Sequence, residues 1–317
     1  MAMYPHVPFP VNFTLSSPLV HLAPIASNST AGWTPSCTSS VCVTTASWST
    51  NTTDSVLSII FYGLDAAVEG TIQGDAKVQA TVDGQPVDWN PSGDALLSVH
   101  GLDQFAQHNL TMKLVNVTAG SRLTVNQARV NGSTIADKIN PFDEWTLFSN
   151  DKSLSYSGFV EESSTPNLAS PTTYVSSKAG DKMSLSFNGS AAVVWGPCGP
   201  SNGLIRVTLD NVESTLNTST PLQADDCLLF QTAGLPTLYM HNMVIENVDG
   251  QSLSINRLGF IRVIIYESHS SAIKNTGKIV GIVLGVIIFI AALIVAYSMR
   301  SRKTRQKINK TFTFLCS

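Results

Sequence analysis

Six histidines and pairs of adjacent carboxylates, such as those at 161–162 and 225–226, are the residues whose types could support acid–base chemistry. His108 and His241 each precede an asparagine at the start of an expected strand, and we interpret both as structural residues. The Glu pair at 161–162 and the Asp pair at 225–226 are sequence neighbours, so in a strand their side chains point to opposite faces. A glycosidase needs two carboxyl groups that flank one glycosidic bond. Neither pair is therefore expected to act as a catalytic acid and base.

Motifs for metal-dependent or phosphate chemistry are absent from the sequence. There is no His-Glu-x-x-His and no P-loop. We therefore expect no catalytic residues, no cofactor and no metal site, and we do not expect the chain to be an enzyme.

The five cysteines form two close pairs and one single residue, Cys316. Cys37 with Cys42 and Cys198 with Cys227 are the candidate disulfides, which require an oxidising compartment. Neither spacing matches a zinc site. Two buried thiols stay the alternative for Cys198 and Cys227, and a Cys37–Cys42 bridge is expected to have only local consequence.

Binding of a sugar ring on a β-sandwich typically needs an exposed aromatic side chain, which directs attention to the five tryptophans. Trp89 lies in the turn-rich stretch QPVDWNPSG, and Trp33 lies near the leading edge of the first of two repeated units. These two are the candidate ligand residues. Trp195 lies in the apolar run AAVVWG and is expected in the core, and core packing is the alternative for the others as well.

Short alternating runs separated by Gly, Asn, Asp, Ser and Pro turns must position these residues. This pattern predicts an all-β sandwich. The chain also repeats itself in four ordered matches. The matched segments are 57–70 with 183–196, 78–84 with 205–211, 96–109 with 228–242, and 114–126 with 245–256. We therefore expect two copies of one β unit, with Asp83 and Asp210 each opening a hairpin turn.

One uninterrupted apolar run, Ile279 to Tyr297, predicts a transmembrane helix. Its nineteen residues without a charge span about 28 Å, close to the thickness of a bilayer's hydrocarbon core; a buried core helix is the alternative. Six basic and no acidic residues follow in the tail 300–317, so the positive-inside rule places the C-terminus in the cytoplasm and the preceding residues outside. Gly281 and Gly285 have helix-packing spacing and are the candidate contacts of a homodimer.

Charge and glycosylation triplets agree with this orientation. Outside the tail, 13 basic and 22 acidic residues leave a net charge near −9, which argues against nucleic acid as a partner. The expected location is the plasma membrane or another secretory-pathway membrane, with the lipid bilayer as a partner. Asn-x-Ser/Thr acceptors occur at Asn12, Asn28, Asn51, Asn109, Asn116, Asn131, Asn188 and Asn217.

The N-terminal residues do not fit a secretory leader. The stretch MAMYPHVPFPVNF has no Lys or Arg and no apolar run of seven, and the first such basic residue is Lys77. Either the sequence starts downstream of the natural start or the predicted topology is wrong. We favour a missing signal peptide, because the other signals agree with each other.

The order of short motifs resembles that of a broad group of fungal membrane proteins. Those proteins carry one or two galactose-binding-like β-sandwich (jelly-roll) domains, a single transmembrane helix and a cytoplasmic tail. The motifs are SPL (17–19), GW (32–33), FYG (61–63), VDG (82–84), HNL (108–110) and LTVN (123–126). The resemblance covers about residues 12–310, although members of the group usually begin with a signal peptide and often have a longer stalk and tail. It implies the fold more specifically than the function.

The resemblance implies an all-β chain of two tandem jelly-roll β-sandwich domains followed by one C-terminal transmembrane α-helix. Similar sandwiches occur as carbohydrate-binding modules, so we expect non-catalytic binding of cell-wall glycan by loops at one rim. The alternative is a structural or adhesion scaffold that binds protein partners. The expected segments are an N-terminal segment 1–11, domain 1 at 12–133, a linker at 134–142, domain 2 at 143–267, a stalk at 268–278, the helix at 279–299 and a basic tail at 300–317.

Overall fold

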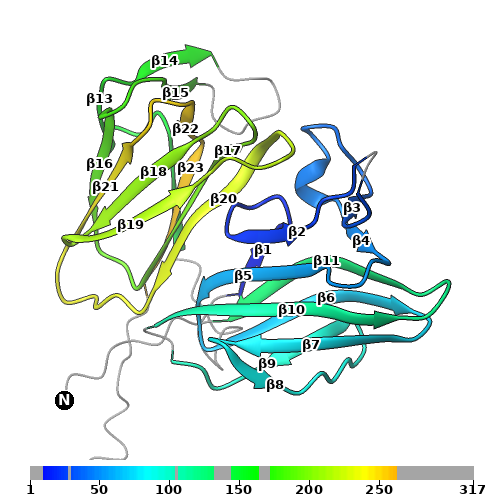
Figure 1. Ribbon diagram of the computed structural model, residues 1–317. Coiled ribbons are helices and arrows are strands. Elements are labelled where there is room, and N and C mark those ends of the chain that lie inside the picture. Colours follow the sequence, from blue (N-terminus) through cyan, green and yellow to red (C-terminus); the bar gives the residue numbers. More distant parts are fainter. Residues whose placement is uncertain (1–9, 28–29, 104–105, 132–143, 164–171, 263–317) are drawn as a thin grey trace, which may run out of the picture. The chain divides into compact units, whose positions relative to one another are not determined.

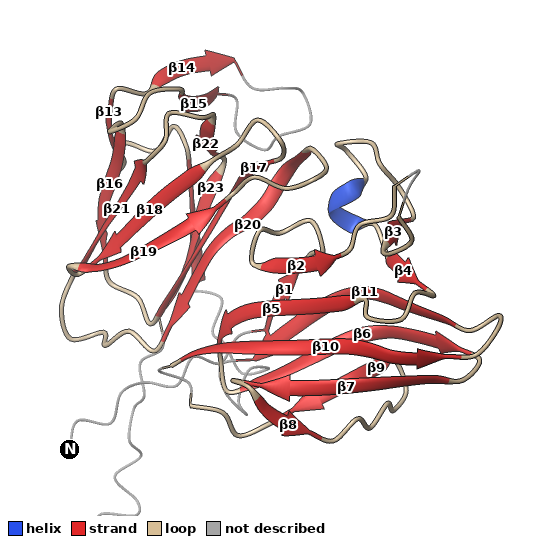
Figure 2. Cartoon of the chain, viewed as in Figure 1, coloured by secondary structure: helices blue, strands red, loops and turns tan. Residues whose placement is uncertain are grey.

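The computed structural model describes residues 10–27, 30–103, 106–131, 144–163 and 172–262. Strands dominate this part of the chain, and its one helical element is the short 3-10 turn η1, Val43–Thr45 (Figures 1 and 2). The prediction of an all-β fold is therefore confirmed for the described residues. Residues Met1–Ile265 belong to one compact unit.

The first half of this unit forms two antiparallel sheets. One has the order β3-β4-β11-β6-β9, with β1 also paired to β11, and the other has the order β2-β5-β10-β7-β8. The strands are β1 Pro10–Phe13, β2 Val20–Ala23, β3 Thr34–Pro35, β4 Trp48–Thr50, β5 Val56–Tyr62, β6 Asp65–Gln73, β7 Ala76–Val82, β8 Gln85–Val87, β9 Ala95–Val99, β10 Gln107–Val117 and β11 Arg122–Asn131.

The second half contains three antiparallel sheets. Their orders are β12-β23-β17-β20, β13-β16-β21-β18-β19 and β14-β15-β22. The strands are β12 Glu144–Phe148, β13 Ser155–Ser157, β14 Val160–Ser163, β15 Thr172–Ser176, β16 Lys182–Phe187, β17 Ala191–Cys198, β18 Leu204–Leu209, β19 Val212–Asn217, β20 Ala224–Ala233, β21 His241–Asn247, β22 Leu253–Ile255 and β23 Arg257–Ile261.

The two halves share one strand order. The sheet β2-β5-β10-β7-β8 corresponds strand by strand to β13-β16-β21-β18-β19, and the path β11-β6-β9 corresponds to β23-β17-β20. The two hairpin turns that follow β7 and β18 begin at Asp83 and Asp210, whose φ angles are 51° and 48°. This correspondence agrees with the four sequence matches between the halves.

Alternation of apolar and polar residues explains how most strands face the core. In β5 the buried residues are Leu57, Ile59 and Phe61, with less buried residues between them. In β21 Met243 and Ile245 are buried in the same way. Because side chains alternate across a strand, each such strand buries one face and leaves the other toward solvent.

Strands β17 and β20 depart from this alternation, because almost every residue in them is buried. Val193 and Leu228 pack in the hydrophobic cluster of the first half, whereas Val194 and Leu229 pack in that of the second half. The amide of Gln231 adds a polar link to the backbone of Tyr62: it accepts from the Tyr62 N–H and donates to the Tyr62 carbonyl, both at 2.7 Å. This pair of strands is therefore covered on both faces.

Several predicted segments lie outside the described residues. They are the linker 134–142, the stalk 268–278, the transmembrane helix 279–299 with Gly281 and Gly285, and the tail 300–317 with Cys316. Among the residues that the structure describes, there is no helix of the length and apolarity that a bilayer crossing needs.

Candidate functional site

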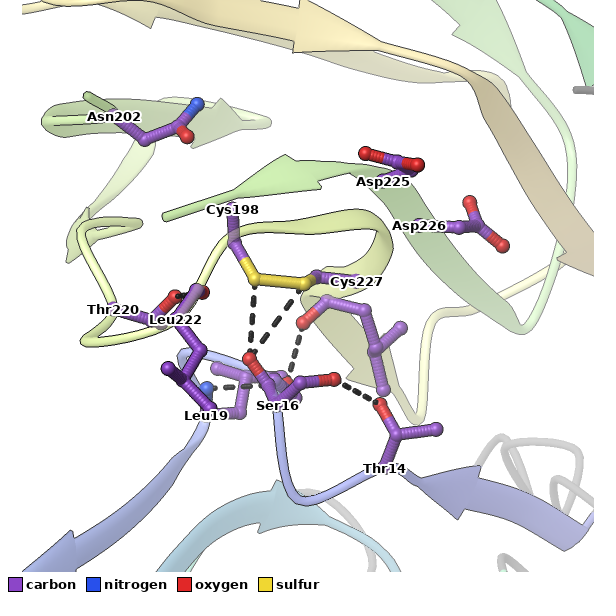
Figure 3. Close-up of a disulfide and its surroundings, with 12 residues drawn as sticks. Thr14, Ser16, Leu19, Cys198, Asn202, Thr220, Leu222, Asp225, Asp226 and Cys227 are labelled. Carbon is purple, nitrogen blue, oxygen red and sulfur yellow. Dashed lines mark hydrogen bonds between the residues drawn. A yellow bond between two sulfur atoms is a disulfide. The ribbon is translucent and has the colours of Figure 1, made fainter. Parts of the chain in front are cut away.

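Both predicted cysteine pairs form disulfides, Cys37 with Cys42 and Cys198 with Cys227. The Cys198–Cys227 bridge joins β17 to β20 and is completely buried (Figure 3). The carbonyl oxygen of Ser16 lies 3.1 Å from Sγ of Cys198 and 3.6 Å from Sγ of Cys227. A bridged sulfur carries no hydrogen, so these are packing contacts. Next to them the Ser17 hydroxyl donates to the Leu228 carbonyl at 2.5 Å, which ties the two halves together.

The Cys37–Cys42 bridge has more than local consequence, contrary to the sequence-based expectation. Val43, the residue after the bridge, is fully buried in the hydrophobic cluster of the second half. The Ser40 hydroxyl, inside the bridged loop, donates to the Asp225 carboxylate at 3.3 Å. The small bridged loop therefore holds a contact between the halves.

The predicted ligand tryptophans do not present open rings. Trp33 is only 1% exposed, and its indole N–H donates to the Val56 carbonyl at 2.9 Å, so its ring belongs to the core. Trp89 is half-buried and packs against the first hydrophobic cluster. Trp195 is also half-buried, with the Arg257 guanidinium 4.5 Å from its ring centre. The ring of Trp33 is therefore a core residue and cannot contact a ligand. The ring of Trp89 is only partly accessible.

A histidine–aspartate pair recurs in both halves, and we call each pair a clasp. In the first half, His108 Nδ1 lies 2.7 Å from Asp83 Oδ2, and His108 Nε2 lies 2.7 Å from the Asp103 carbonyl oxygen. In the second half, His241 Nδ1 lies 2.5 Å from Asp210 Oδ2, and Nε2 lies 2.8 Å from the Pro236 carbonyl oxygen. The structural role inferred for both histidines agrees with this geometry.

Each clasp uses both oxygens of its carboxylate. The backbone N–H of Asn109 donates to Asp83 and that of Asn242 donates to Asp210, at 2.8 and 2.9 Å. Both ring nitrogens of each buried histidine face oxygen acceptors, an arrangement that the doubly protonated ring satisfies in full. Burial acts to raise the pKa of Asp83 and Asp210, but the hydrogen bonds from histidine and backbone, with the imidazolium charge, hold both pKa values below the usual range.

The second clasp lies beside a cavity of about 330 Å³, which we call the tyrosine cavity. Tyr62 and Tyr239 both line it, and Tyr239 is 54% exposed. Polar lining groups come from Asp210, Ser214 and Thr232. The remaining lining residues are Val207, Leu209, Val212, Phe230, Ala233, Gly234, Leu235 and Pro236.

The loop between β20 and β21 positions Tyr239. It begins at Gly234, whose φ of 77° is one that glycine adopts readily. The Leu235 N–H donates to the Ser190 carbonyl at 2.9 Å, and the Asn188 side-chain amide donates to the Thr237 carbonyl at 3.1 Å. The His241 ring holds the loop through Pro236 and lies 4.9 Å from the Tyr239 ring. An exposed aromatic ring is thus carried on a loop with several anchors.

The two carboxylate pairs named from the sequence lie elsewhere. Asp226 pairs with Arg257 at 2.6 Å and accepts from Asn256 at 3.1 Å, while Asp225 accepts from Ser40. Residues 161–162 are exposed on β14. No cluster of three or more His, Cys, Asp or Glu residues that could hold a metal ion occurs in the described ranges.

Sequence reasoning missed Tyr62 and Tyr239. The available signal was the stretch GLPTLYM (234–240), where apolar residues stand next to one another in a connection between two strands. Apolar residues in such a loop must either be buried or form an exposed patch, and here Leu238, Tyr239 and Met240 are exposed.

Most acceptor asparagines of the glycosylation triplets are exposed where the structure describes their side chains. Asn188 is the exception, because it is half-buried, its amide donates to Thr237 and its Oδ1 is buried. Asn28 and the side chain of Asn131 lie outside the described part. The exposed acceptors are Asn12, Asn51, Asn109, Asn116 and Asn217.

Comparison with known proteins gives only distant similarities. No protein-family model and no curated protein matches the chain. A Paenibacillus xanthan lyase is 11% identical over 83% of this chain and 27% of its own, with a TM-score of 0.30. A two-domain esterase active on acetylated mannans, co-crystallised with mannopentaose, is 15% identical over 39% and 38%, with a TM-score of 0.30. A Pseudomonas aeruginosa protein of unknown function is 7% identical over 77% and 99%, with a TM-score of 0.22.

The chain spans 27% and 38% of the length of the first two of these structures. At TM-scores of 0.30 and below, the similarities carry no argument about function. The functional argument therefore rests on the geometry of the cavities.

Proposed function

We propose that this protein binds carbohydrate without catalysis, and that the tyrosine cavity is the binding site. The observation that carries the proposal is the exposed ring of Tyr239 at the edge of a cavity of about 330 Å³ that also contains polar groups. This combination of an apolar surface with a few placed polar groups is typical of small-molecule sites.

The lining supplies the two contacts that a sugar ring needs. The faces of Tyr239 and Tyr62 can cover the apolar C–H face of a pyranose. The hydroxyl groups of Ser214 and Thr232 can exchange hydrogen bonds with sugar hydroxyls. A volume of about 330 Å³ is at the low end for ligand sites, which favours one or two sugar residues at a chain end over a long polysaccharide groove.

The state of Asp210 supports binding rather than hydrolysis. It is the one carboxylate among the described residues that line the cavity, and the clasp occupies both of its oxygens. Glycoside hydrolysis commonly requires two carboxyl groups, one of which must be able to gain and lose a proton. Asp210 is a single carboxylate, and its partners hold it ionised, so the cavity meets neither requirement.

The cellular setting forms part of the proposal. A transmembrane helix at 279–299 would anchor the chain in a plasma or secretory-pathway membrane, with the β-sheets outside and residues 300–317 in the cytoplasm. The two disulfides support an oxidising compartment. The ligand would then be a cell-wall or external glycan.

The test is an array of neutral and acidic oligosaccharides probed with the purified full-length chain. Saturable binding should weaken about tenfold or more in Tyr239→Ala, which is about 1.4 kcal/mol of binding free energy. Leu238→Ala is the matched control, because Leu238 is 82% exposed and does not line the cavity. A folded chain that binds no saccharide, or binds equally well after Tyr239→Ala, overturns the proposal.

A second candidate function is a scaffold that binds a protein partner. Leu238, Met240 and Val212 are exposed apolar side chains on segments that adjoin the cavity, Val212 itself being part of its lining. Contiguous exposed apolar surface commonly marks a protein contact. Leu238→Asp separates the two functions: it should disrupt a protein complex and leave saccharide binding unchanged.

A further inference from the structure

A second cavity, which we call the interface cavity, lies between residues 15–25 of the first half and the segment 217–222 of the second, which begins at the last residue of β19. Its volume is about 380 Å³, and Val43 and Trp48 complete its lining. It shares no lining residue with the tyrosine cavity. Figure 3 shows part of its wall, where Ser16, Thr220 and Leu222 lie near the buried disulfide.

The interface cavity has an uncharged lining. Among the described residues that form it there is no Asp, Glu, Lys or Arg, and His21 is the one ionisable side chain. A charged ligand would lose hydration there without gaining an opposite charge, which is costly. The cavity therefore selects an uncharged ligand.

Its polar groups define which hydrogen bonds that ligand should make. The Ser17 hydroxyl is closed to a ligand, because Ser17 is fully buried, donates to the Leu228 carbonyl and accepts from the Leu19 N–H at 3.2 Å. The half-buried Thr220 hydroxyl donates to the Leu222 carbonyl at 2.9 Å and keeps lone pairs that accept hydrogen bonds from a ligand. A ligand that donates to Thr220 must carry hydroxyl or amide hydrogens.

Trp48 provides an aromatic surface in the cavity lining. It is 3% exposed and lines the cavity, and its indole N–H has no hydrogen-bond partner among the described residues. That nitrogen is itself buried, so the part of Trp48 that a ligand in the cavity can touch is its ring. Sugar hydroxyls and acetamido groups both donate and accept, and the Trp48 ring and neighbouring Leu22 provide apolar contacts.

We propose that the interface cavity binds one uncharged pyranose residue. This inference does not depend on the tyrosine cavity, since the two sites have separate linings. The sugar has two chemically equivalent sources, a free saccharide or a glycan attached to this chain.

Asn217 is the residue that could carry the attached glycan. It lines the cavity, it is exposed, and it heads the triplet Asn217-Thr218-Ser219. The exposed Ser219 also lines the cavity, and its N–H donates to Asn217 Oδ1 at 3.0 Å. A glycan linked to Asn217 would hold its first sugar at the cavity, and a tether of this kind raises the effective concentration into the millimolar range.

The experiment follows the indole N–H signals of the five tryptophans by NMR in the full-length chain labelled with ¹⁵N-tryptophan. Trp48→Phe assigns the Trp48 signal; if that variant does not fold, Thr220→Val replaces it as the variant that should weaken the response. One arm uses chain from a host without N-glycosylation, titrated with N-acetylglucosamine and methyl mannoside, with glucuronate as the charged control. The other arm uses glycosylated chain and compares Asn217→Gln with Asn116→Gln, an exposed acceptor outside the cavity.

A shift of the Trp48 signal with uncharged sugars and not with glucuronate supports a free saccharide as the source. A Trp48 signal that differs between wild type and Asn217→Gln, but not between wild type and Asn116→Gln, supports the attached glycan. No change in either arm overturns the inference, and so does an equal response to glucuronate.

Discussion

The two halves of the molecule have the same strand order but different faces exposed. Strand β6 of the first half alternates between buried and less buried residues, whereas its counterpart β17 and the neighbouring β20 are buried along almost their whole length. The connectivity is shared, and β17 and β20 of the second half contribute side chains to the hydrophobic clusters of both halves. Topology and surface are therefore separable properties of this repeat.

The clasps that the halves share are structural, whereas each candidate site combines residues of both halves. The clasps of His108 and His241 match in every hydrogen bond described above. The buried disulfide belongs to the second half alone. So do the exposed loop with Tyr239 and the segment 217–222. In this molecule the scaffold is shared, and the candidate sites form where the two halves meet.

The largest expected effect comes from removing the disulfide that only the second half has. The double variant Cys198→Ala and Cys227→Ala opens a loop with a sequence separation of 29 residues. The chain-entropy model assigns such a loop about 3.5 kcal/mol of unfolding free energy. Urea unfolding at neutral pH measures this loss.

The matched control is the double variant Cys37→Ala and Cys42→Ala, which opens a loop with a separation of five residues. The same model assigns that loop about 2 kcal/mol. A larger loss for the short loop than for the long one would show that contacts of Val43 between the halves outweigh chain entropy.

A smaller effect is expected from breaking the polar link between the halves. Gln231→Leu keeps the size of the side chain but leaves the Tyr62 N–H and carbonyl without their partners. Two unpaired backbone groups should lower the unfolding free energy by about 2 kcal/mol. Calorimetry should also show the single unfolding transition broadening into two, because the halves are then held together less tightly.

Gln127→Leu is the control within one half, since among the described residues the half-buried Gln127 amide donates to Glu69 of the same half. This variant should lower the unfolding free energy by less than Gln231→Leu does, and calorimetry should still show one unfolding transition. If both variants lower stability equally and neither splits the transition, the covered face of β17 and β20 does not couple the halves.

The sequence predicted strands, turns and duplication because those depend on local periodicity. Asp83 and Asp210 were assigned to turns for their backbone preference, and both have positive φ. Their pairing with His108 and His241 could have been predicted from the sequence, because an Asp turn and a later His-Asn pair recur together in both copies. The apolar runs in β17 and β20 also indicate burial on both faces.

The candidate sites were less predictable, because exposure depends on which surfaces of the folded chain meet. Trp33 and Tyr239 both stand in connections rich in turn residues, yet Trp33 is buried and Tyr239 is exposed. The difference comes from β-strand packing over Trp33 and from the anchors that hold the loop around Pro236. Neither cause is visible in local sequence.

The smallest expected effect tests whether the clasps act alike. The pKa of Asp83 and of Asp210 is lower in the folded chain than the ordinary value near 3.9, so each carboxylate stabilises the fold above that pH. The contribution is lost as pH falls below about 4, through the lowered pKa of the folded state. Asp83→Asn and Asp210→Asn should each flatten the fall of unfolding free energy between about pH 4 and pH 2. Because the two clasps have the same partners, we expect similar changes that add in the double variant, measured by urea unfolding across this range. A change in only one variant would mean that the copies have diverged in their scaffold as well as in their surfaces.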